Sequence, residues 1–277
     1  MEHPQFSDAD IFPRSLTVHV VLDHDPRYRG SIHDDAVARS RGYKAALVPG
    51  AFIYGHISRV AIDVWGTAWA ERGAMGARFR RPVYNGDTLT IRAAVLNGGP
   101  EMRRTDVSAV NQDGEEVATG WIGLPDVPPQ VPDLTGFTVL PRPEMPPVVG
   151  AGELRAGMPV TTAARILTEA DFRASLSAFG ERHPLYTDPG FVHSGCLMRL
   201  AMGDTNNSFR FPAAVVLTGA EAQHFAPVYP GQRLETAGRI SDAYLRKGKY
   251  YFESEEFLRA DGVPVARFFR TSIYAYE

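Results

Sequence analysis

The chain has 277 residues, of which 44% are apolar and 22% charged, so it is long enough for two ordinary domains with sizeable cores. The net charge of -3 and the pI near 6.3 leave no basic face for a phosphate backbone, so nucleic acid is not an expected partner. The single cysteine, Cys196, excludes an internal disulfide and fits a reducing cytoplasm.

The first residues, MEHPQFSDADIFPRS, are polar. They hold acids and prolines where a signal peptide needs a basic start and an apolar run. No stretch of the sequence reaches the roughly 18 apolar residues of a membrane span. We therefore expect a cytoplasmic protein without a membrane partner.

The first half is expected to be one helix followed by strands. After Gly50, the run AFIYGHISRVAIDVWG is too densely apolar for a surface helix and predicts a mostly buried central helix. Extended segments follow at 75–79, 88–96, 102–110 and 116–124. The pair Asp113-Gly114 lies between the last two segments, where Asp-Gly favours a tight hairpin.

Residues 125–158 are dense in proline and glycine, which disfavours a helix or a central strand over most of their length. We interpret this segment as a long linker packed across the surface. The predicted organisation is an N-terminal domain at 1–124, the linker at 125–158 and a C-terminal domain at 159–277.

The second half follows the same plan. After Gly195, CLMRLAMGDTNNSFRF predicts a shorter helix that ends at Asn206-Asn207. Extended segments follow at 214–225, 233–242, 249–259 and 265–276, with Asp261-Gly262 between the last two. One buried helix followed by an antiparallel meander predicts an α+β fold in which the sheet wraps the helix.

A repeated block relates the two halves. Residues 78–95 read RFRRPVYNGDTLTIRAAV and residues 223–240 read QHFAPVYPGQRLETAGRI, which share P-V-Y-x-G-x-x-L. Pro82 matches Pro227 at an offset of 145, and the same offset matches Gly50 with Gly195. Two landmarks in register predict that one supersecondary unit is used twice.

Four phrases carry a resemblance to a known family: GYKAALVPG, FRRPVYNGDTL, FRASLSAFGERHPLYTDPG and HFAPVYPGQRL. With them the chain resembles the MaoC-like hydratases and dehydratases in their fused form, over nearly all of its length outside the linker. The resemblance implies an α+β double hot-dog, in which each half is an antiparallel sheet wrapped around a central helix. It also implies that an acyl-CoA-type thioester lies in a tunnel between the helices, where water is added to a 2-enoyl thioester or removed from a 3-hydroxyacyl thioester.

That reaction needs a base that activates water for attack at C3, a donor that protonates C2, and N–H groups for the thioester oxygen. The family supplies an aspartate and, five residues later, a histidine in the phrase G-D-x-N-P-L-H. A backbone N–H comes from the glycine that opens the hot-dog helix. The CoA thioester is the substrate, and no further cofactor is implied.

In the second half, GERHPLYTD lies over the family phrase, with Glu181 at the aspartate position and Tyr186 at the histidine position. A glutamate can act as a base, and a tyrosine with a pKa of about 10 can donate a proton. We therefore expect Glu181 and Tyr186 to be one candidate acid/base pair. Gly195 follows Tyr186 by only nine positions, a shorter spacing than the family usually has there.

In the first half, His33 lies seventeen residues before Gly50, close to the family spacing, but Tyr28 occupies the aspartate position. His33 and Asp34 form the second candidate acid/base pair. The run His33-Asp34-Asp35 also suits the N-terminus of a helix, where the macrodipole favours carboxylates. Both interpretations stay open, because each half holds only part of a dyad.

Gly50 and Gly195 are the candidate oxyanion donors, and His193, beside the second helix opening, is a candidate contact to the thioester. A tight turn or close packing explains the two glycines equally well. A solvent-facing side chain would explain His193. His56 and Arg59 share a face of the first helix, for which a structural hydrogen bond is favoured.

Two other functions stay open. A hot-dog thioesterase would use the same glycine N–H groups, with Glu181 or Asp34 activating water toward the carbonyl carbon. A non-catalytic acyl-CoA binder, or a partner subunit, would explain why both dyads depart from the family phrase. No H-x-x-x-H, H-E-x-x-H or G-x-S-x-G occurs, so neither a metal site nor a serine nucleophile is expected. A fused pair is compatible with a homodimer.

Overall fold

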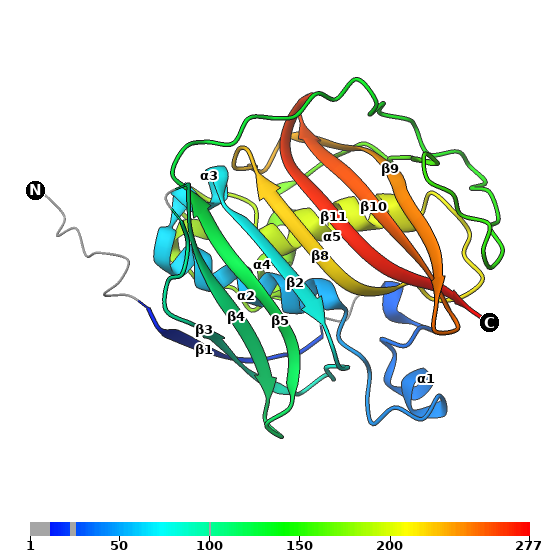
Figure 1. Cartoon of the computed structure of the whole chain (residues 1–277), viewed down its shortest axis with the longest axis horizontal. Coiled ribbons are helices and arrows are strands. Elements are labelled where there is room, and N and C mark those ends of the chain that lie inside the picture. The colour runs from blue at the N-terminus through cyan, green and yellow to red at the C-terminus, as the bar shows by residue number, and fades with distance from the viewer. Residues whose placement is uncertain (1–11, 23–25, 100) are drawn as a thin grey trace, which may run out of the picture.

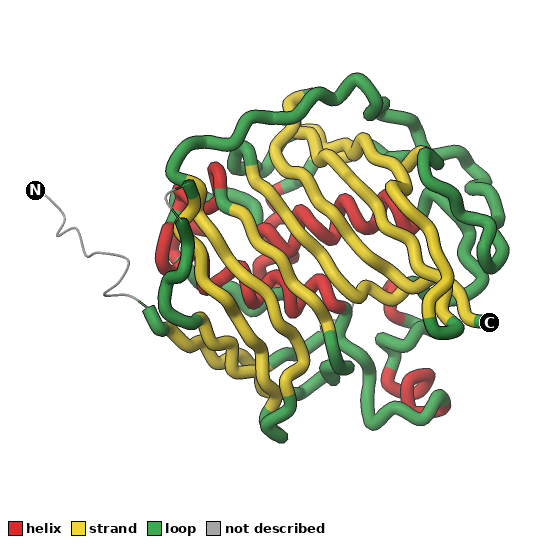
Figure 2. The backbone as a smooth tube through the Cα atoms, in the orientation of Figure 1, coloured by secondary structure: helices red, strands yellow, loops and turns green. Residues whose placement is uncertain are grey.

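The structure is a computed structural model that describes residues 12–22, 26–99 and 101–277. Two long helices lie side by side behind one large antiparallel sheet (Figures 1 and 2). No helix among the described residues is long and apolar enough to cross a membrane. Most of the N-terminal phrase MEHPQFSDADIFPRS lies outside the described residues.

The first half packs one long helix, α2, against its strands. Its elements in chain order are β1 (Arg14–His19), the 3-10 turn η2 (Pro26–Tyr28), α1 (Asp35–Ser40), α2 (Gly50–Trp65), α3 (Thr67–Arg72), β2 (Ala74–Phe79), β3 (Thr88–Ala93), β4 (Met102–Asn111) and β5 (Glu116–Pro125).

The second half packs α5 in the same way. Its elements are β6 (Pro159–Val160), β7 (Arg165–Ile166), α4 (Glu169–Ala178), the 3-10 turn η3 (Pro184–Tyr186), α5 (Ser194–Asn206), β8 (Val216–His224), β9 (Arg233–Arg246), β10 (Lys249–Ala260) and β11 (Val263–Tyr276). The structure confirms both predicted central helices and all eight predicted strands, with bounds that differ by a few residues.

One sheet runs through both halves. Its strand order is β1-β3-β4-β5-β2-β8-β11-β10-β9-β6, with β7 also on β9. The halves join where β2 pairs antiparallel with β8, with Ala77 opposite Ala220. The two-residue turn Asp261-Gly262, with both φ angles positive, closes the β10–β11 hairpin as Asp-Gly predicts.

Helix α2 is buried on nearly every side because the sheet covers one side of it and α5 packs against another. Phe52, Ile57 and Val60 are at most 1% exposed. The two helix backbones approach closely, since a Cβ on Gly195 would lie 2.9 Å from the Cα of Gly55. A single apolar core therefore spans both halves.

The helix starts correct the sequence register by one residue. Helix α2 follows the N-cap Pro49 and α5 follows the N-cap His193, an offset of 144. The hydrogen bonds just before each helix agree with an offset of 144. Val48 N–H donates to the Val83 carbonyl, and Val192 N–H donates to the Val228 carbonyl. Gly50 therefore corresponds to Ser194, and the match of Gly50 with Gly195 is wrong at this point.

The sequence analysis missed β1 and α4. Helix α4 carries a full capping box, in which Thr168 accepts from Asp171 N–H and Asp171 accepts from Thr168 N–H. This signature is visible in the sequence at 168–171, directly before the family phrase, which begins at Phe172.

Residues 126–158 contain no helix or strand and pass around the second half (Figure 1). Phe137 contacts Phe257 with ring centroids 4.8 Å apart, and Arg142 pairs with the buried Asp204 at 2.7 Å. Leu154 belongs to a small second core with strand residues of β9, β10 and β11. This segment is therefore held by specific packing.

Candidate functional site

The two central helices begin in different surroundings. We call the residues around Gly50 the α2 site, namely Tyr28, His33, Gly50 and Arg199. The α5 site comprises the residues around Ser194, namely Phe179, Glu181, Tyr186, His193 and Ser194. Every member of the α2 site is partly exposed, whereas every member of the α5 site is buried.

The α2 site begins with an uncapped helix N-terminus. Pro49 is the N-cap and offers no side-chain hydrogen bond. The Gly50 N–H donates to no acceptor among the residues that the structure describes. Because the helix dipole places partial positive charge at this end, the N–H group favours an oxygen that gains negative charge.

The hydrogen bond that His33 makes leaves one of its ring nitrogens able to accept a proton. Its Nδ1 lies 2.6 Å from the carbonyl oxygen of Leu47, three residues before Gly50. Because a carbonyl can only accept, Nδ1 carries the proton and Nε2 keeps its lone pair. Burial lowers the pKa of His33 below 6.5, the hydrogen bond to Leu47 opposes this shift, and Arg199 adds to it. His33 is therefore neutral at pH 7.

Two further residues complete the α2 site. The Tyr28 ring lies edge-on to His33, with ring centroids 5.4 Å apart. Arg199, on α5, donates to the Tyr28 hydroxyl oxygen at 3.3 Å and covers the Phe52 ring at 4.6 Å. Both halves therefore contribute to this site. The sequence placed Tyr28 at the aspartate position but gave no signal for Arg199, which reaches the site from the other half.

Asp34 has a structural position. Its carboxylate accepts from Ala36 N–H at 3.0 Å and from Gly30 N–H at 3.3 Å, as the N-cap of α1. Its neighbour Asp35 accepts from Ala46 N–H at 3.1 Å and so fixes the chain ahead of α2. The interpretation of His33-Asp34-Asp35 as the N-terminus of a helix is therefore confirmed, because Asp34 caps α1.

The α5 site begins with a capped helix. His193, which is 1% exposed, accepts the Gly195 N–H on Nδ1 at 3.0 Å. The Gly195 N–H is therefore already engaged. Burial lowers the pKa of His193 to about 3, helped by His56 and Arg59, so this imidazole is neutral.

Glu181 holds the turn that precedes η3. It accepts from Arg182 N–H at 2.7 Å and from His183 N–H at 2.8 Å. Arg59 Nε and His193 Nε2 each lie 3.7 Å from this carboxylate. Arg59 is thus the charged partner of Glu181, because His193 is neutral.

Tyr186 is enclosed beside that carboxylate. It is 1% exposed, and its hydroxyl has no hydrogen-bond partner among the described residues. Burial raises the pKa of Tyr186 well above 10, and the charge of Glu181 adds to the rise. The hydroxyl therefore stays protonated and shielded from solvent.

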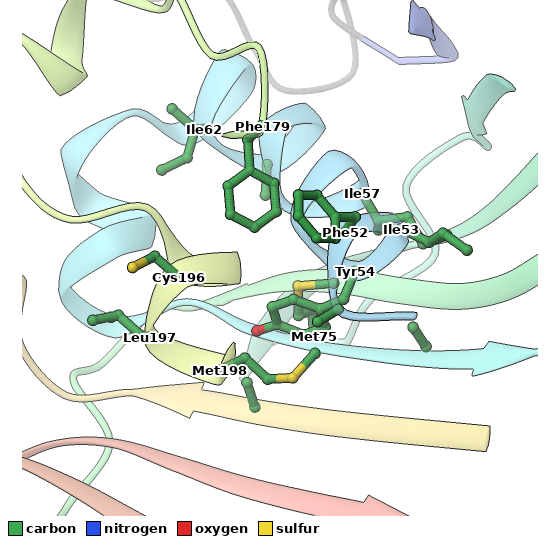
Figure 3. Packing of buried hydrophobic residues seen from close by; sticks show 14 of the residues in the cluster. Phe52, Ile53, Tyr54, Ile57, Ile62, Met75, Phe179, Cys196, Leu197 and Met198 are labelled. Carbon is green, nitrogen blue, oxygen red and sulfur yellow. The ribbon is translucent and has the colours of Figure 1, made fainter. Parts of the chain in front are cut away.

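Phe179 fills the space between the helix starts. A Cβ on Gly55 would lie 2.3 Å from the Phe179 ring, and a Cβ on Gly195 would lie 2.6 Å from it. The ring stacks on His193 with centroids 4.3 Å apart and contacts Phe52 with centroids 4.9 Å apart. Figure 3 shows Phe179 beside Phe52. The two glycines therefore make room for an aromatic plug.

A buried polar network holds the first residue of α5. Ser194 Oγ lies 3.0 Å from the Tyr54 hydroxyl and 2.9 Å from His224 Nε2. Burial lowers the pKa of His224 to about 4, and burial with the charge of Arg59 lowers that of His56 to about 4. These histidines serve the packing of the two halves. No cluster that could hold a metal ion lies among the described residues.

Comparisons with known proteins identify the fold. No family model matches the chain, and no curated protein of similar sequence was found. The structure is similar to a conserved hypothetical protein from Mycobacterium tuberculosis described as having a double hotdog fold, at 15% identity and a TM-score of 0.63, covering 95% of this chain and 97% of that one.

Two named enzymes have the same architecture. A MaoC-like dehydratase matches at 15% identity with a TM-score of 0.59, covering 94% of this chain and 97% of that one. An acyl-ACP thioesterase from Bacteroides thetaiotaomicron matches at 10% identity with a TM-score of 0.51, covering 96% and 100%. The predicted α+β double hot-dog fold is therefore confirmed.

Proposed function

We propose that this double hot-dog protein is a hydratase or dehydratase of acyl-CoA-type thioesters, and that it works at the α2 site. One observation carries the proposal: His33 is bound through Nδ1 to the Leu47 carbonyl, three residues before a helix start whose Gly50 N–H has no acceptor among the described residues, and so keeps the lone pair of Nε2. A base next to a preorganised donor is what addition of water to an enoyl thioester requires.

In the proposed reaction, His33 Nε2 takes a proton from the water that attacks C3. The Gly50 N–H holds the thioester oxygen as it becomes enolate-like, and one such donor contributes about 3 to 4 kcal/mol. The Tyr28 hydroxyl then protonates C2, and Arg199, at 3.3 Å from that oxygen, offsets the charge left on it. The His33 imidazolium then returns its proton through solvent to the Tyr28 phenolate, which restores both groups. Dehydration follows the same steps in reverse.

The α5 site receives no catalytic role in this proposal. Glu181 is occupied by two backbone N–H groups, and Tyr186 is shielded from solvent. Asp34 is the cap of α1, and the Gly195 N–H is bound to His193. We propose no cofactor beyond the thioester substrate.

A thioesterase is the second candidate. Tyr28 stands where the family has its aspartate, so no carboxylate contacts His33 among the described residues. Hydrolysis needs only one base for water and a donor for the carbonyl oxygen, and His33 with Gly50 would supply both.

The test is a panel of 2-enoyl-CoA and 3-hydroxyacyl-CoA substrates of increasing chain length. Loss or gain of the conjugated enoyl absorbance and release of free thiol are recorded together, with His33→Gln as the matched variant. Absorbance change without thiol supports the hydratase. Thiol release supports the thioesterase, and acyl-CoA binding without turnover contradicts both enzymes in favour of a non-catalytic binder.

A further inference from the structure

The turn between β9 and β10 carries three positively charged side chains. Arg246, Lys247 and Lys249 are exposed, and none of them forms an ion pair with a residue that the structure describes. In the strand register, Lys249 pairs with Arg246 on β9 and with Tyr276 on β11. Directly opposite residues share one face of a sheet. Arg246, Lys249 and Tyr276 therefore form a row on a single face.

Tyrosine rings adjoin this row. Tyr276 is 50% exposed, and Tyr43, on the segment between α1 and α2, is 36% exposed. Burial raises the pKa of Tyr276, and the neighbouring Tyr43 and Tyr251 add to the rise, so the three rings lie together. Tyr244 and Tyr251 stack with ring centroids 5.4 Å apart. Figure 1 shows the ends of β9, β10 and β11 above α1, where these rings gather. Exposed aromatic surface of this kind marks a binding site.

The strand register places these residues within reach of the α2 site. A Cβ on Gly50 would lie 3.4 Å from Leu217, and Leu217 pairs with Ser272 on β11. Tyr276 follows Ser272 by four positions, which is roughly 13 Å at about 3.3 Å per residue. Tyr43 lies on the segment that leads into α2. A long ligand held at the Gly50 N–H can therefore extend along the end of the sheet to these rings.

We call Tyr43, Arg246, Lys247, Lys249 and Tyr276 the turn patch. We propose that the turn patch binds the nucleotide end of coenzyme A, which makes coenzyme A the acyl carrier. This inference rests on the function proposed above. The adenine stacks on the Tyr276 ring, the three cations of the turn bind the phosphates, and the pantetheine arm runs to the thioester at Gly50. Stacking on an aromatic ring suits any base, and cations beside it suit phosphate groups.

The chemistry of the turn patch favours a single nucleotide over an acidic carrier protein or a nucleic-acid strand. A carrier protein would use the cations but would bring no flat base to the exposed tyrosine rings. A strand needs a longer run of cations, and the net charge of the chain is -3. Of the acids beside the patch, Glu253 is bonded to the Tyr244 hydroxyl at 3.3 Å, and Glu277 lies next to Gly248. The three cations outnumber them.

The test compares a four-carbon 2-enoyl-CoA with the same acyl group on pantetheine, which lacks the nucleotide. The double variant Arg246→Glu/Lys249→Glu should lower the ratio of kcat/KM for the CoA thioester to that for the pantetheine thioester on the order of 100-fold, because phosphate contacts are lost. Tyr276→Leu should lower this ratio about 10-fold through loss of stacking. Calorimetry with adenosine 3′,5′-bisphosphate should show binding to the wild type and none to the double variant.

Arg78→Glu is the control, since Arg78 is exposed on β2, away from the turn patch. It should leave the ratio and the bisphosphate affinity unchanged. A ratio that stays the same in the double variant, a wild type that does not bind the bisphosphate, or a preference for the carrier-protein thioester would overturn the inference. Bisphosphate binding that depends on Arg246 and Lys249, without turnover of any thioester, would contradict the proposed function and support the nucleotide site.

Discussion

The starts of α2 and α5 occupy corresponding places in the two halves, yet their surroundings are opposite. At α2, the N-cap Pro49 offers no side-chain hydrogen bond, and His33 presents a lone pair in a partly exposed position. At α5, the Gly195 N–H is capped by His193, and Phe179 fills the space in front. Duplication thus leaves one helix start uncapped and partly exposed and turns the other into core.

The largest predicted effect is a loss of folding stability at acidic pH, caused by three buried histidines. His56, His193 and His224 around α5 have folded pKa values of about 4, 3 and 4, below the unfolded value of about 6.5. Between these values the unfolded chain binds more protons, so stability is full above pH 6.5 and is lost as the pH falls.

The free energy of unfolding should fall by about 1.4 kcal/mol per pH unit for each histidine, or about 4 kcal/mol per pH unit for all three together. Urea unfolding at pH values from 7 to 4.5 measures this slope. A free energy of unfolding that stays constant from pH 7 to pH 5 would show that His56, His193 and His224 are not buried as neutral imidazoles.

Removing a tyrosine hydroxyl should lower the activity when the tyrosine is in the α2 site but not when it is in the α5 site. Tyr28→Phe is expected to lower kcat/KM about 10 to 100-fold, because it removes the proposed proton donor at C2. Tyr186→Phe is the matched variant and should leave kcat/KM within about threefold, since the Tyr186 hydroxyl is buried without a partner among the described residues. Steady-state hydration of a 2-enoyl-CoA measures both. Equal losses would remove the distinction between the sites.

Adding a methyl group at the start of each central helix should lower the free energy of unfolding more at α5 than at α2. In Gly195→Ala the new Cβ would lie 2.6 Å from Phe179, which should cost about 1 to 3 kcal/mol by overpacking. In Gly50→Ala the Cβ would lie 3.2 Å from Phe79, a partly buried side chain that can shift, so a loss below about 1 kcal/mol is expected. Chemical denaturation compares them, and a larger loss at Gly50 would contradict the plug.

The smallest effect is expected at Asp34. Asp34→Ala should destabilise by about 1 kcal/mol through loss of the α1 N-cap. The kcat/KM of Asp34→Ala should change little. Asp34→Asn can still cap α1 and should match the wild type in both stability and activity. A large activity loss in Asp34→Asn would restore the carboxylate to the catalytic pair.

Sequence patterns predicted the fold well because it depends on local signals. The dense apolar run after Gly50 and the Asp261-Gly262 turn carry their structures in the residues themselves. The repeat also predicted two equivalent units. It failed by one residue at Ser194, because equal spacing between landmarks does not reveal which residue starts a helix.

The site was only partly predictable. The spacing from His33 to Gly50 singled out three residues of the α2 site, Tyr28, His33 and Gly50, because they lie on one stretch of chain. Arg199 reaches that site from the other half, and Phe179 closes the α5 site by entering a slot between Gly55 and Gly195. Both features depend on how two helices pack, which no local pattern records.

The central claim is that the α2 site alone acts on the thioester. It is tested most directly by comparing His33→Gln with Glu181→Gln for hydration of a four-carbon 2-enoyl-CoA. We expect kcat/KM to fall about 10² to 10⁴-fold in His33→Gln and to stay within about threefold in Glu181→Gln. On the acid side, the wild-type profile should lose activity only below pH 6.5, because burial lowers the pKa of the His33 base. A severe loss in Glu181→Gln with activity preserved in His33→Gln would contradict the account.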